Sequence, residues 1–550
     1  MIRQPGAFRP EDGPAWQRIR RYAVPAWMIE QATAHRLAGD WRAACATAAV
    51  DVAFELPEIE ARYGAAVAGA VADDLRHLAP DLLRWHLPRV LGGRTTIEPD
   101  LRIVLASYGG ADGPSLSVTT PTMIEGPQRL RLHCAPVVPV KWRSYGGGGF
   151  RPESWVAARP FWDARRAPEL GARFGEPAGP ADRIARLQAA GDFEAAYAAA
   201  GIVRDLTVPA ARRYQRAVDP RALFAHPPLA LARLVPETRR LVAAGAGDRF
   251  RVAFGWPAFL LLEPEGTDRL RARFADQAEA LTVPALPGYT WQPLPDLELV
   301  RTGRTAPREL HPLVSAALFP DAGPAVGPPG PDPGRPVRVR CRGLWHEVRS
   351  RGGVLDVPHT PEEQQRERAM RAFGGQVSGC FAVQQSWTTG EGRLPRGLRE
   401  QRRELFLRVQ HGDTPGVVAL LDAGVDPRVR DARGRGLLHE LHLLDHEALL
   451  PRLLAAGLDL EARDAHERTP LLSAVHWGGS PELVRALLAA GSRIDVLDET
   501  ELSLSQEIRR YRRADLAFLR ERVDAEHPGI GADWFDEHME DREEDEDDDA

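Results

Sequence analysis

Length, composition and charge exclude several classes of protein. The chain has 550 residues, is 43% hydrophobic and carries a formal net charge of -6. It is therefore too apolar for a disordered chain and long enough for three or four domains of about 150 residues. Lys141 is the only lysine, and it is followed by tryptophan. A P-loop, which needs Ser or Thr after its lysine, is therefore excluded. A kinase or a Schiff-base enzyme would have only this one lysine for its chemistry.

Cysteine usage and hydropathy predict the compartment. Cys45, Cys134, Cys341 and Cys380 lie too far apart for a C-x-x-C motif or a dense disulfide framework, which favours a reducing environment. The apolar stretch after Arg20-Arg21 is short and contains a proline, and no run of about 18 uncharged apolar residues occurs. We therefore expect a soluble cytoplasmic protein with no membrane partner.

The first part of the chain is predicted to hold two diverged copies of one α+β module, at residues 1–165 and 180–320, the second with an extension. Leu-Ala-Gly-Asp-Trp at Leu37 returns as Ala-Ala-Gly-Asp-Phe at Ala189. In each copy the glycine would end one helix and the aspartate would cap the next, with strands following. An enzyme with its site in this module is one alternative for the function of the chain.

A basic and aromatic segment lies at the end of the first copy. Residues 141–151 read Lys-Trp-Arg-Ser-Tyr-Gly-Gly-Gly-Gly-Phe-Arg, and such side chains could stack on bases and neutralise phosphates. Arg151 stands where a dinucleotide-binding G-x-G-x-x-G motif counted from Gly146 needs its third glycine. The glycine run favours a flexible connection. Nucleic-acid binding is therefore the least favoured alternative.

A proline- and glycine-rich linker is predicted at residues 321–336, followed by a small β-hairpin and helical domain at residues 337–400. Its first part alternates apolar and polar residues in short runs typical of strands. Thr360-Pro361-Glu362-Glu363 has the pattern of a capping box, which predicts the start of a helix.

Cys380 in this domain has two interpretations. With His346 or His359 it could form a thiol and base pair for nucleophilic catalysis. A small buried cysteine beside Phe381 is the favoured interpretation, because free cysteines are among the most buried residues. We therefore expect no catalytic residue, no metal site and no cofactor.

A repeat follows this domain. Two markers recur at steps of 33 and 34 residues: a glycine after a leucine-rich run, and an aspartate downstream of it. The glycines are Gly424, Gly457 and Gly491, and the aspartates are Asp431, Asp464 and Asp498.

The best copy reads Arg-Thr-Pro-Leu-Leu-Ser-Ala from Arg468, and the middle copy keeps a histidine, His439, without the Thr-Pro pair. Thr469 would cap a helix, and Pro470 would occupy its first position. These residues resemble the T-P-L-H-x-A motif of ankyrin repeats. The resemblance implies a short all-α solenoid over residues 401–524, and a structural role for His439.

The same region contains a second histidine pattern, His442 and His446, which could share a helix face and bind a metal. Its spacing is not H-E-x-x-H, so the structural interpretation is favoured. About three repeats are the minimum for a stable array. We therefore expect the first repeat to dock on the domain before it.

Resemblance to ankyrin repeats also implies function, because such proteins mostly bind other proteins through hairpin tips and inner helices. A non-enzymatic scaffold or adaptor is therefore the favoured function. The predicted partner-binding residues are Arg428, Arg430, Arg433, Arg435, Glu461, Arg463, His466, Glu467 and Arg468. Four arginines in the first tip favour a protein partner with an acidic surface.

An acidic tail, residues 525–550, is predicted to be disordered. From residue 533 onward it holds 12 acidic residues against one arginine, so the rest of the chain has a net charge of +5. The tail is itself one candidate to bind the first tip.

Overall fold

A computed structural model of the chain describes residues 10–110, 113–137, 150–174, 179–207, 224, 229–253, 259–374 and 377–536. The chain divides into two compact units. Unit 1 comprises residues 1–121 and 129–329, and unit 2 comprises residues 122–128 and 330–550. No helix in the described ranges is both long and apolar enough to cross a membrane.

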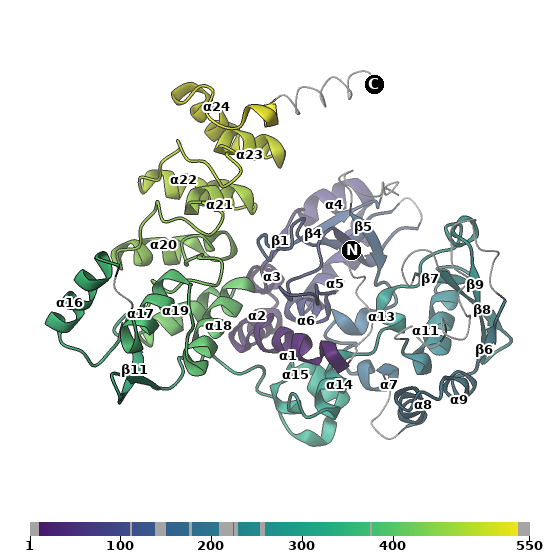
Figure 1. Cartoon of the computed structure of the whole chain (residues 1–550). Helices are drawn as coiled ribbons and strands as arrows, with labels where there is room; N and C mark the ends of the chain where they lie inside the picture. Colours follow the sequence, from purple (N-terminus) through teal and green to yellow (C-terminus); the bar gives the residue numbers. More distant parts are fainter. Residues whose placement is uncertain are drawn as a thin grey trace. The chain divides into compact units, whose positions relative to one another are not determined.

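Unit 1 contains both helices and sheets, as predicted for the first part of the chain (Figure 1). Its helices are α1 (Gly13–Tyr22), α2 (Ala26–Leu37), α3 (Trp41–Thr47), α4 (Leu56–Tyr63), α5 (Ala65–His77), α6 (Pro80–His86), α7 (Glu169–Phe174), α8 (Pro180–Ala189), α9 (Phe193–Ala199), α11 (Leu231–Ala243), α12 (Gln277–Ala280), α13 (Gly288–Trp291), α14 (Pro295–Arg301) and α15 (Pro312–Leu318). Several begin with a proline, which is tolerated there because the first amides of a helix have no intrahelical acceptor.

The first sheet of unit 1 has the strand order β1-β4-β3-β2-β5. These strands are β1 (Val50–Val52), β2 (Leu101–Ser107), β3 (Ser115–Thr119), β4 (Leu130–Ala135) and β5 (Arg151–Ser154). The β1–β4 and β2–β5 pairs are parallel, and the other two pairs are antiparallel. Leu101, Ile103 and Leu105 of β2 alternate toward the core, as expected for a sheet with one apolar face.

The second sheet of unit 1 has the order β6-β9-β8-β7. Its strands are β6 (Ile202–Asp205), β7 (Phe250–Ala253), β8 (Phe259–Glu265) and β9 (Arg269–Ala275). As in the first sheet, the strand after the helical hairpin pairs in parallel with the last strand of an antiparallel meander. The two sheets therefore share one topology, apart from the additional β5.

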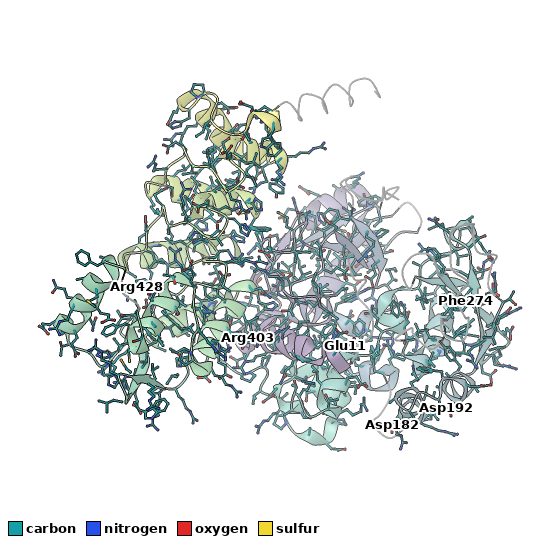
Figure 2. All side chains as sticks on the ribbon, in the orientation of Figure 1. Glu11, Asp182, Asp192, Phe274, Arg403 and Arg428 are labelled. Carbon is teal, nitrogen blue, oxygen red and sulfur yellow. The ribbon has the colours of Figure 1, made fainter. Side chains whose placement is uncertain are left out.

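The helical hairpins that precede the two sheets also correspond. Asp40 accepts a hydrogen bond from Ala43 N at 2.9 Å at the start of α3, and Asp192 accepts one from Ala195 N at 3.1 Å at the start of α9. Figure 2 labels Asp192 on the ribbon. Each aspartate satisfies an amide that the first turn of a helix leaves free. The helix caps and the sheet order thus correspond between residues 1–165 and 180–320, which the sequence predicts to be two copies of one module.

Unit 2 begins with a small sheet, with the order β10-β11-β12 and antiparallel pairing. Strands β10 (Val337–Cys341), β11 (Leu344–Arg351) and β12 (Val354–Asp356) occupy the predicted positions. Helices α16 (Pro361–Ala372) and α17 (Gly379–Thr389) follow. The Thr360 hydroxyl accepts from Glu363 N at 3.3 Å and Glu363 Oε2 accepts from Thr360 N at 3.1 Å, which confirms the capping box.

The rest of unit 2 is a series of helix pairs stacked one on the next (Figure 1). Its members are α18 (Arg396–Gln410), α19 (Thr414–Asp422), η5 (Leu441–Leu443), α20 (His446–Ala455), α21 (Pro470–His476), α22 (Pro481–Ala489), α23 (Leu504–Arg510) and α24 (Ala517–Glu526). In the second pair, the short 3-10 helix η5 stands where the others have a full α-helix. That copy lacks the Thr-Pro start, whereas the Thr469 hydroxyl caps α21 by accepting from Leu472 N at 3.3 Å.

Gly424, Gly457 and Gly491 each follow the second helix of a pair and have positive φ values of 92°, 78° and 104°. Glycine adopts this conformation at low cost, so each helix can end and the chain can turn. One apolar core runs from Val339 of β10 to Val523 of α24. The small sheet and the helix pairs are therefore parts of the same hydrophobic structure.

Candidate functional site

Three loops that join successive helix pairs have the same internal geometry. Asp431, Asp464 and Asp498 each accept, at Oδ1, backbone N–H groups two and four residues later, over 2.8 to 3.1 Å. The third residue after each aspartate has positive φ: 72° at Gly434, 58° at Glu467 and 64° at Glu501. The aspartate marker in the sequence is thus the residue that holds each loop in shape.

Neighbouring loops are also joined to one another. Ala465 N donates to Arg433 O at 2.8 Å, and Glu499 N donates to His466 O at 3.0 Å. The two bonds occupy corresponding positions of successive loops. The three loops therefore form one continuous edge of unit 2, from which their side chains project.

Most predicted partner-binding residues lie on this edge, but their exposure differs. Arg428, Arg433, Arg463 and Glu467 are exposed, and Arg430, Glu461, His466 and Arg468 are half-buried. Arg435 is 7% exposed, which contradicts its expected position at an exposed tip. Its guanidinium forms ion pairs with Asp431 at 2.9 Å, Glu440 at 2.9 Å and Glu125 at 3.0 Å, so it acts within the fold.

All three exposed arginines of the edge also bind acids of unit 2 itself, and Arg463 pairs with the exposed Glu467 at 3.1 Å. Arg428 pairs with the buried Asp426 at 2.9 Å, within its own loop. Arg433 pairs with Glu125 at 3.1 Å, although its side chain remains 54% exposed. Arg433 and Arg463 are therefore the arginines of this edge that offer positive charge to a partner without holding a buried aspartate.

The histidines near residue 440 have internal hydrogen bonds. His439 Nδ1 accepts from Gly436 N at 3.2 Å, and His442 Nδ1 lies 3.1 Å from His439 O. Both side chains are buried. These contacts favour the structural interpretation of His439 over a metal pair formed by His442 and His446.

A pH dependence of stability follows from His439. Burial lowers its pKa below 6.5, its ordinary value, so the native state binds less proton than the unfolded state below that pH. The neutral ring therefore contributes to the free energy of unfolding above about pH 6.5, and this contribution is lost as the pH falls. The free energy of unfolding then decreases by at most about 1.4 kcal/mol per pH unit.

We expect His439→Asn, whose amide oxygen can still accept from Gly436 N, to unfold with a weaker pH dependence than the wild-type chain between pH 7 and 5. Urea titrations at several pH values measure this. Equal slopes in the two proteins would contradict a buried neutral His439.

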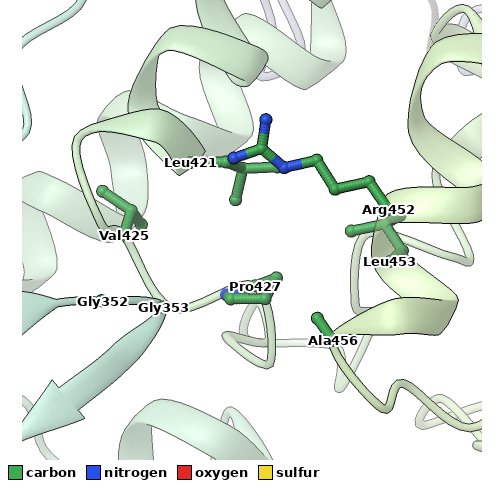
Figure 3. A pocket seen from close by; sticks show the side chains of 8 residues that line it. All are labelled: Gly352, Gly353, Leu421, Val425, Pro427, Arg452, Leu453 and Ala456. Carbon is green, nitrogen blue, oxygen red and sulfur yellow. The ribbon is translucent and has the colours of Figure 1, made fainter.

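A pocket of about 240 Å³ lies in unit 2, between the β11–β12 turn and the first two helix pairs (Figure 3). Its lining residues are Gly352, Gly353, Leu421, Val425, Pro427, Arg452, Leu453 and Ala456. Arg452 is the only charged residue among them, and it pairs with Asp422 at 2.6 Å. A lining of this kind can accommodate an apolar group, but it offers no nucleophile or general base.

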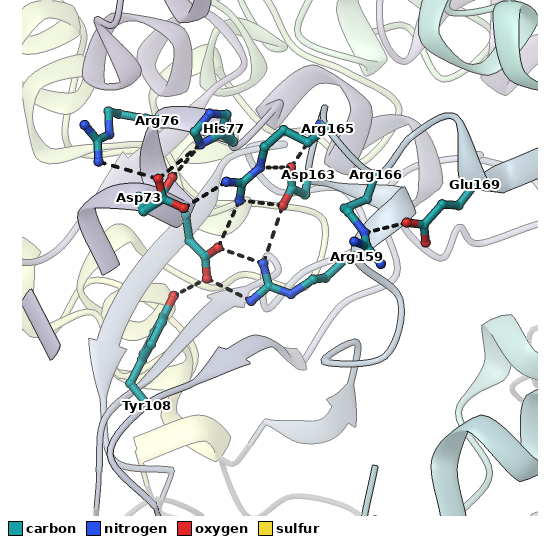
Figure 4. A network of polar contacts seen from close by, with 10 residues as sticks. Asp73, Arg76, His77, Tyr108, Arg159, Asp163, Arg165, Arg166 and Glu169 are labelled. Atoms are coloured by element: carbon teal, nitrogen blue, oxygen red, sulfur yellow. Dashed lines mark hydrogen bonds and ion pairs between the residues drawn. The ribbon is translucent and has the colours of Figure 1, made fainter. Parts of the chain in front are cut away.

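Unit 1 contains a network of ion pairs that the sequence did not indicate (Figure 4). Asp74 receives both terminal nitrogens of Arg159, at 2.7 and 3.0 Å. Asp163 pairs with Arg165 at 2.9 Å, and Arg165 also reaches Asp73 at 2.8 Å. Each of these carboxylates is paired with an arginine. The ion pairs therefore hold α5 to residues 159–165, and the arrangement is not that of a general acid beside a general base.

The most distinctive chemical group in unit 2 is a cluster of two cysteines and two histidines. Cys341, His346, His359 and Cys380 each present one potential ligand atom, and these atoms all lie within 4.8 Å of one another. Cys341 Sγ is 3.6 Å from His359 Nε2, and Cys380 Sγ is 3.5 Å from His346 Nδ1. Both cysteines are buried and free of disulfides.

Four elements bring these residues together. Cys341 ends β10, His346 lies on β11, His359 follows β12, and Cys380 is in the first turn of α17. The predicted burial of Cys380 is confirmed. The structure also brings its thiol next to His346, one of the two histidines that the sequence offered as a base. Burial and the neighbouring Cys341 raise the pKa of Cys380 to about 12, so its thiol is neutral unless a cation is bound nearby.

Sequence reasoning offered Cys380 with His346 or His359 as a thiol and base, but it missed Cys341 and the set of four, because these residues follow one another with gaps of 4, 12 and 20 residues. The familiar zinc patterns pair cysteine with cysteine and histidine with histidine at short spacing. One signal was available in the sequence. The alternation of apolar and polar residues predicts the β10–β11 hairpin, and this hairpin places Cys341 and His346 near its turn.

Most of the basic segment 141–151 and the acidic tail from residue 537 lie outside the described residues. Residues 525–536, predicted to be disordered, are folded instead: α24 extends to Glu526, and Ala532 and Phe535 are buried. No protein-family model matches the chain, and a search of curated proteins finds no similar sequence. Function is therefore inferred from the residues themselves.

Proposed function

We propose that the chain is a non-enzymatic scaffold, and that residues 401–524 form an ankyrin repeat array that binds another protein. The observation that carries this proposal is the edge of three equivalent loops, each held by its aspartate and bonded to the next. Stacked units of about 33 residues with a shared core are typical of repeat solenoids.

The partner would bind along this loop edge. Arg433 and Arg463 project from two neighbouring loops, and their side chains are 54% and 47% exposed. Exposed arginines spaced along one edge favour a partner with acidic side chains, because guanidinium groups bind carboxylates in a bidentate manner. We further propose that the duplicated module provides a second surface and that the protein acts in the cytoplasm.

The test compares protein capture by three forms of the full chain. The tip variant is Arg433→Glu with Arg463→Glu. The control is Arg485→Glu with Arg522→Glu, which reverses two exposed arginines on helices α22 and α24. Arg428 and Arg435 are left unchanged because they pair with aspartates in their own loops.

We expect wild type and control to capture the same protein from a host lysate and the tip variant to lose it. With the purified partner, the tip variant should bind at least about tenfold more weakly, because its two new glutamates would face the acidic side chains of the partner. The affinity of the wild type should fall as salt rises. Equal binding by the tip variant would overturn the proposed edge.

A further inference from the structure

We propose that Cys341, His346, His359 and Cys380 bind one Zn²⁺ ion in a closed structural site. Thiolate sulfur and imidazole nitrogen are the ligands zinc prefers, and two of each complete its usual set of four. With all four positions taken by protein, no place is left for water or substrate. The ion would therefore stabilise the fold and would not activate a reactant.

The separations agree with tetrahedral coordination. Zinc bonds of about 2.3 Å to sulfur and about 2.0–2.1 Å to nitrogen place a sulfur and a nitrogen about 3.6 Å apart on the edge of a tetrahedron. Two of the four sulfur–nitrogen pairs, Cys341 with His359 and Cys380 with His346, are 3.6 Å and 3.5 Å apart, and all four ligand atoms lie within 4.8 Å of one another. An ion at the centre of the four atoms thus requires little movement of the side chains.

Surrounding residues support one ligand in particular. His359 Nε2 faces Cys341, while its Nδ1 lies 3.3 Å from the carboxylate of Glu363. A carboxylate on the second ring nitrogen orients a metal-binding histidine and increases its basicity. Phe381 packs on the same ring, with centroids 4.5 Å apart, and the His359 side chain is 5% exposed.

The backbone also fits a site that joins the hairpin to α17. Gly379 precedes Cys380 and has φ of 61°, and a Cβ at this position would lie 2.6 Å from Cys341 Sγ. Only glycine permits this approach without displacing the sulfur.

The site lies in the part of unit 2 that covers the first helix pair. Gly353 N donates to Gly424 O at 3.2 Å, and Arg430 N donates to Trp387 O at 3.0 Å. Leu355 N donates to Asp426 Oδ2 at 3.2 Å. These bonds join the first helix pair to the small sheet and to α17. A metal ion that joins the hairpin to α17 would add stability to the apolar core that they share with the helix pairs.

Zinc content of the full-length protein tests the proposal. The wild-type chain, expressed with added zinc and dialysed, should contain about one zinc ion per chain by mass spectrometry of the metals. Cys341→Ser and Cys380→Ser should each contain less than about a tenth of this. The matched control is Cys45→Ser with Cys134→Ser, which changes the two other buried cysteines and should retain the wild-type content.

Cobalt provides a second readout that needs no variant. Replacing zinc by Co²⁺ in the wild-type chain should give the visible absorption of tetrahedral cobalt and a thiolate-to-cobalt charge-transfer band, with release of the two thiol protons. A wild-type chain without stoichiometric zinc and without this cobalt spectrum would overturn the proposal. So would zinc retained in full by the Cys341 and Cys380 variants.

Discussion

Replacing Asp296 with alanine is expected to lower the free energy of unfolding of unit 1 by about 3–5 kcal/mol, because it leaves a buried charge without its partner. Asp296 accepts two hydrogen bonds from Arg20, at 2.9 and 2.7 Å, and one from Trp85 Nε1 at 3.0 Å. The side chains of Arg20 and Asp296 are 3% and 0% exposed. Arg20 also donates to the backbone carbonyl of Trp85 at 2.7 Å, and in the alanine variant this hydrogen bond remains while both bonds to Asp296 are lost.

Denaturant unfolding of the full chain, with hydrogen exchange of α1 and α14, measures this loss and places it in unit 1. The informative control is the double variant Arg20→Met with Asp296→Leu, which removes both charges and keeps apolar volume. It should recover most of the lost stability, since an apolar pair often replaces a buried ion pair without cost. An equal loss in both variants would show that packing, and not charge, is responsible.

Gly390→Ala is expected to destabilise unit 2 by at least about 3 kcal/mol, because it combines backbone strain with a steric clash. Gly390 ends α17 with φ of 81° and ψ of -14°, a left-handed conformation. A Cβ there would lie 2.0 Å from the carbonyl oxygen of Asp431, the residue that holds the first loop. The clash would separate α17 from the loop edge proposed to bind a partner.

Gly457→Ala is the matched control for this change. Gly457 has φ of 78°, but a Cβ there would meet no described atom within 4 Å. It should therefore cost only the strain of the left-handed conformation, about 1–2 kcal/mol. Thermal unfolding of both variants, with proteolysis to locate the damage in unit 2, provides the comparison. Similar losses in the two proteins would contradict the close approach of Gly390 to Asp431.

Local patterns predicted several elements well. Strands at residues 337–357 and the helix after Thr360 follow from alternation and from a capping box, which depend on neighbours along the chain. The steps of 33 and 34 residues correctly marked the turning glycines and the loop aspartates, since each repeat uses them in the same way. The short 3-10 helix η5 in place of a full α-helix agrees with the loss of Thr-Pro in the middle copy.

The candidate sites were harder to predict from the sequence. Arg435 carries the same charge as Arg433, but the fold buries the first beside Glu440 and exposes the second. Burial of a particular arginine depends on which acids lie beside it in space, and a charge pattern does not contain that information.

By itself, the sequence determined the repeat length, the loop and turn residues, and the helix starts, because these depend on interactions within about four residues and on periodic spacing. Only the tertiary structure decided which distant residues meet. Cys341 and Cys380 are 39 positions apart and belong to a strand and a helix, and they come together because that helix packs on the hairpin. Arg20 likewise contacts Asp296 because α1 packs on α14. Such contacts are selected by how apolar faces pack, which no local pattern specifies.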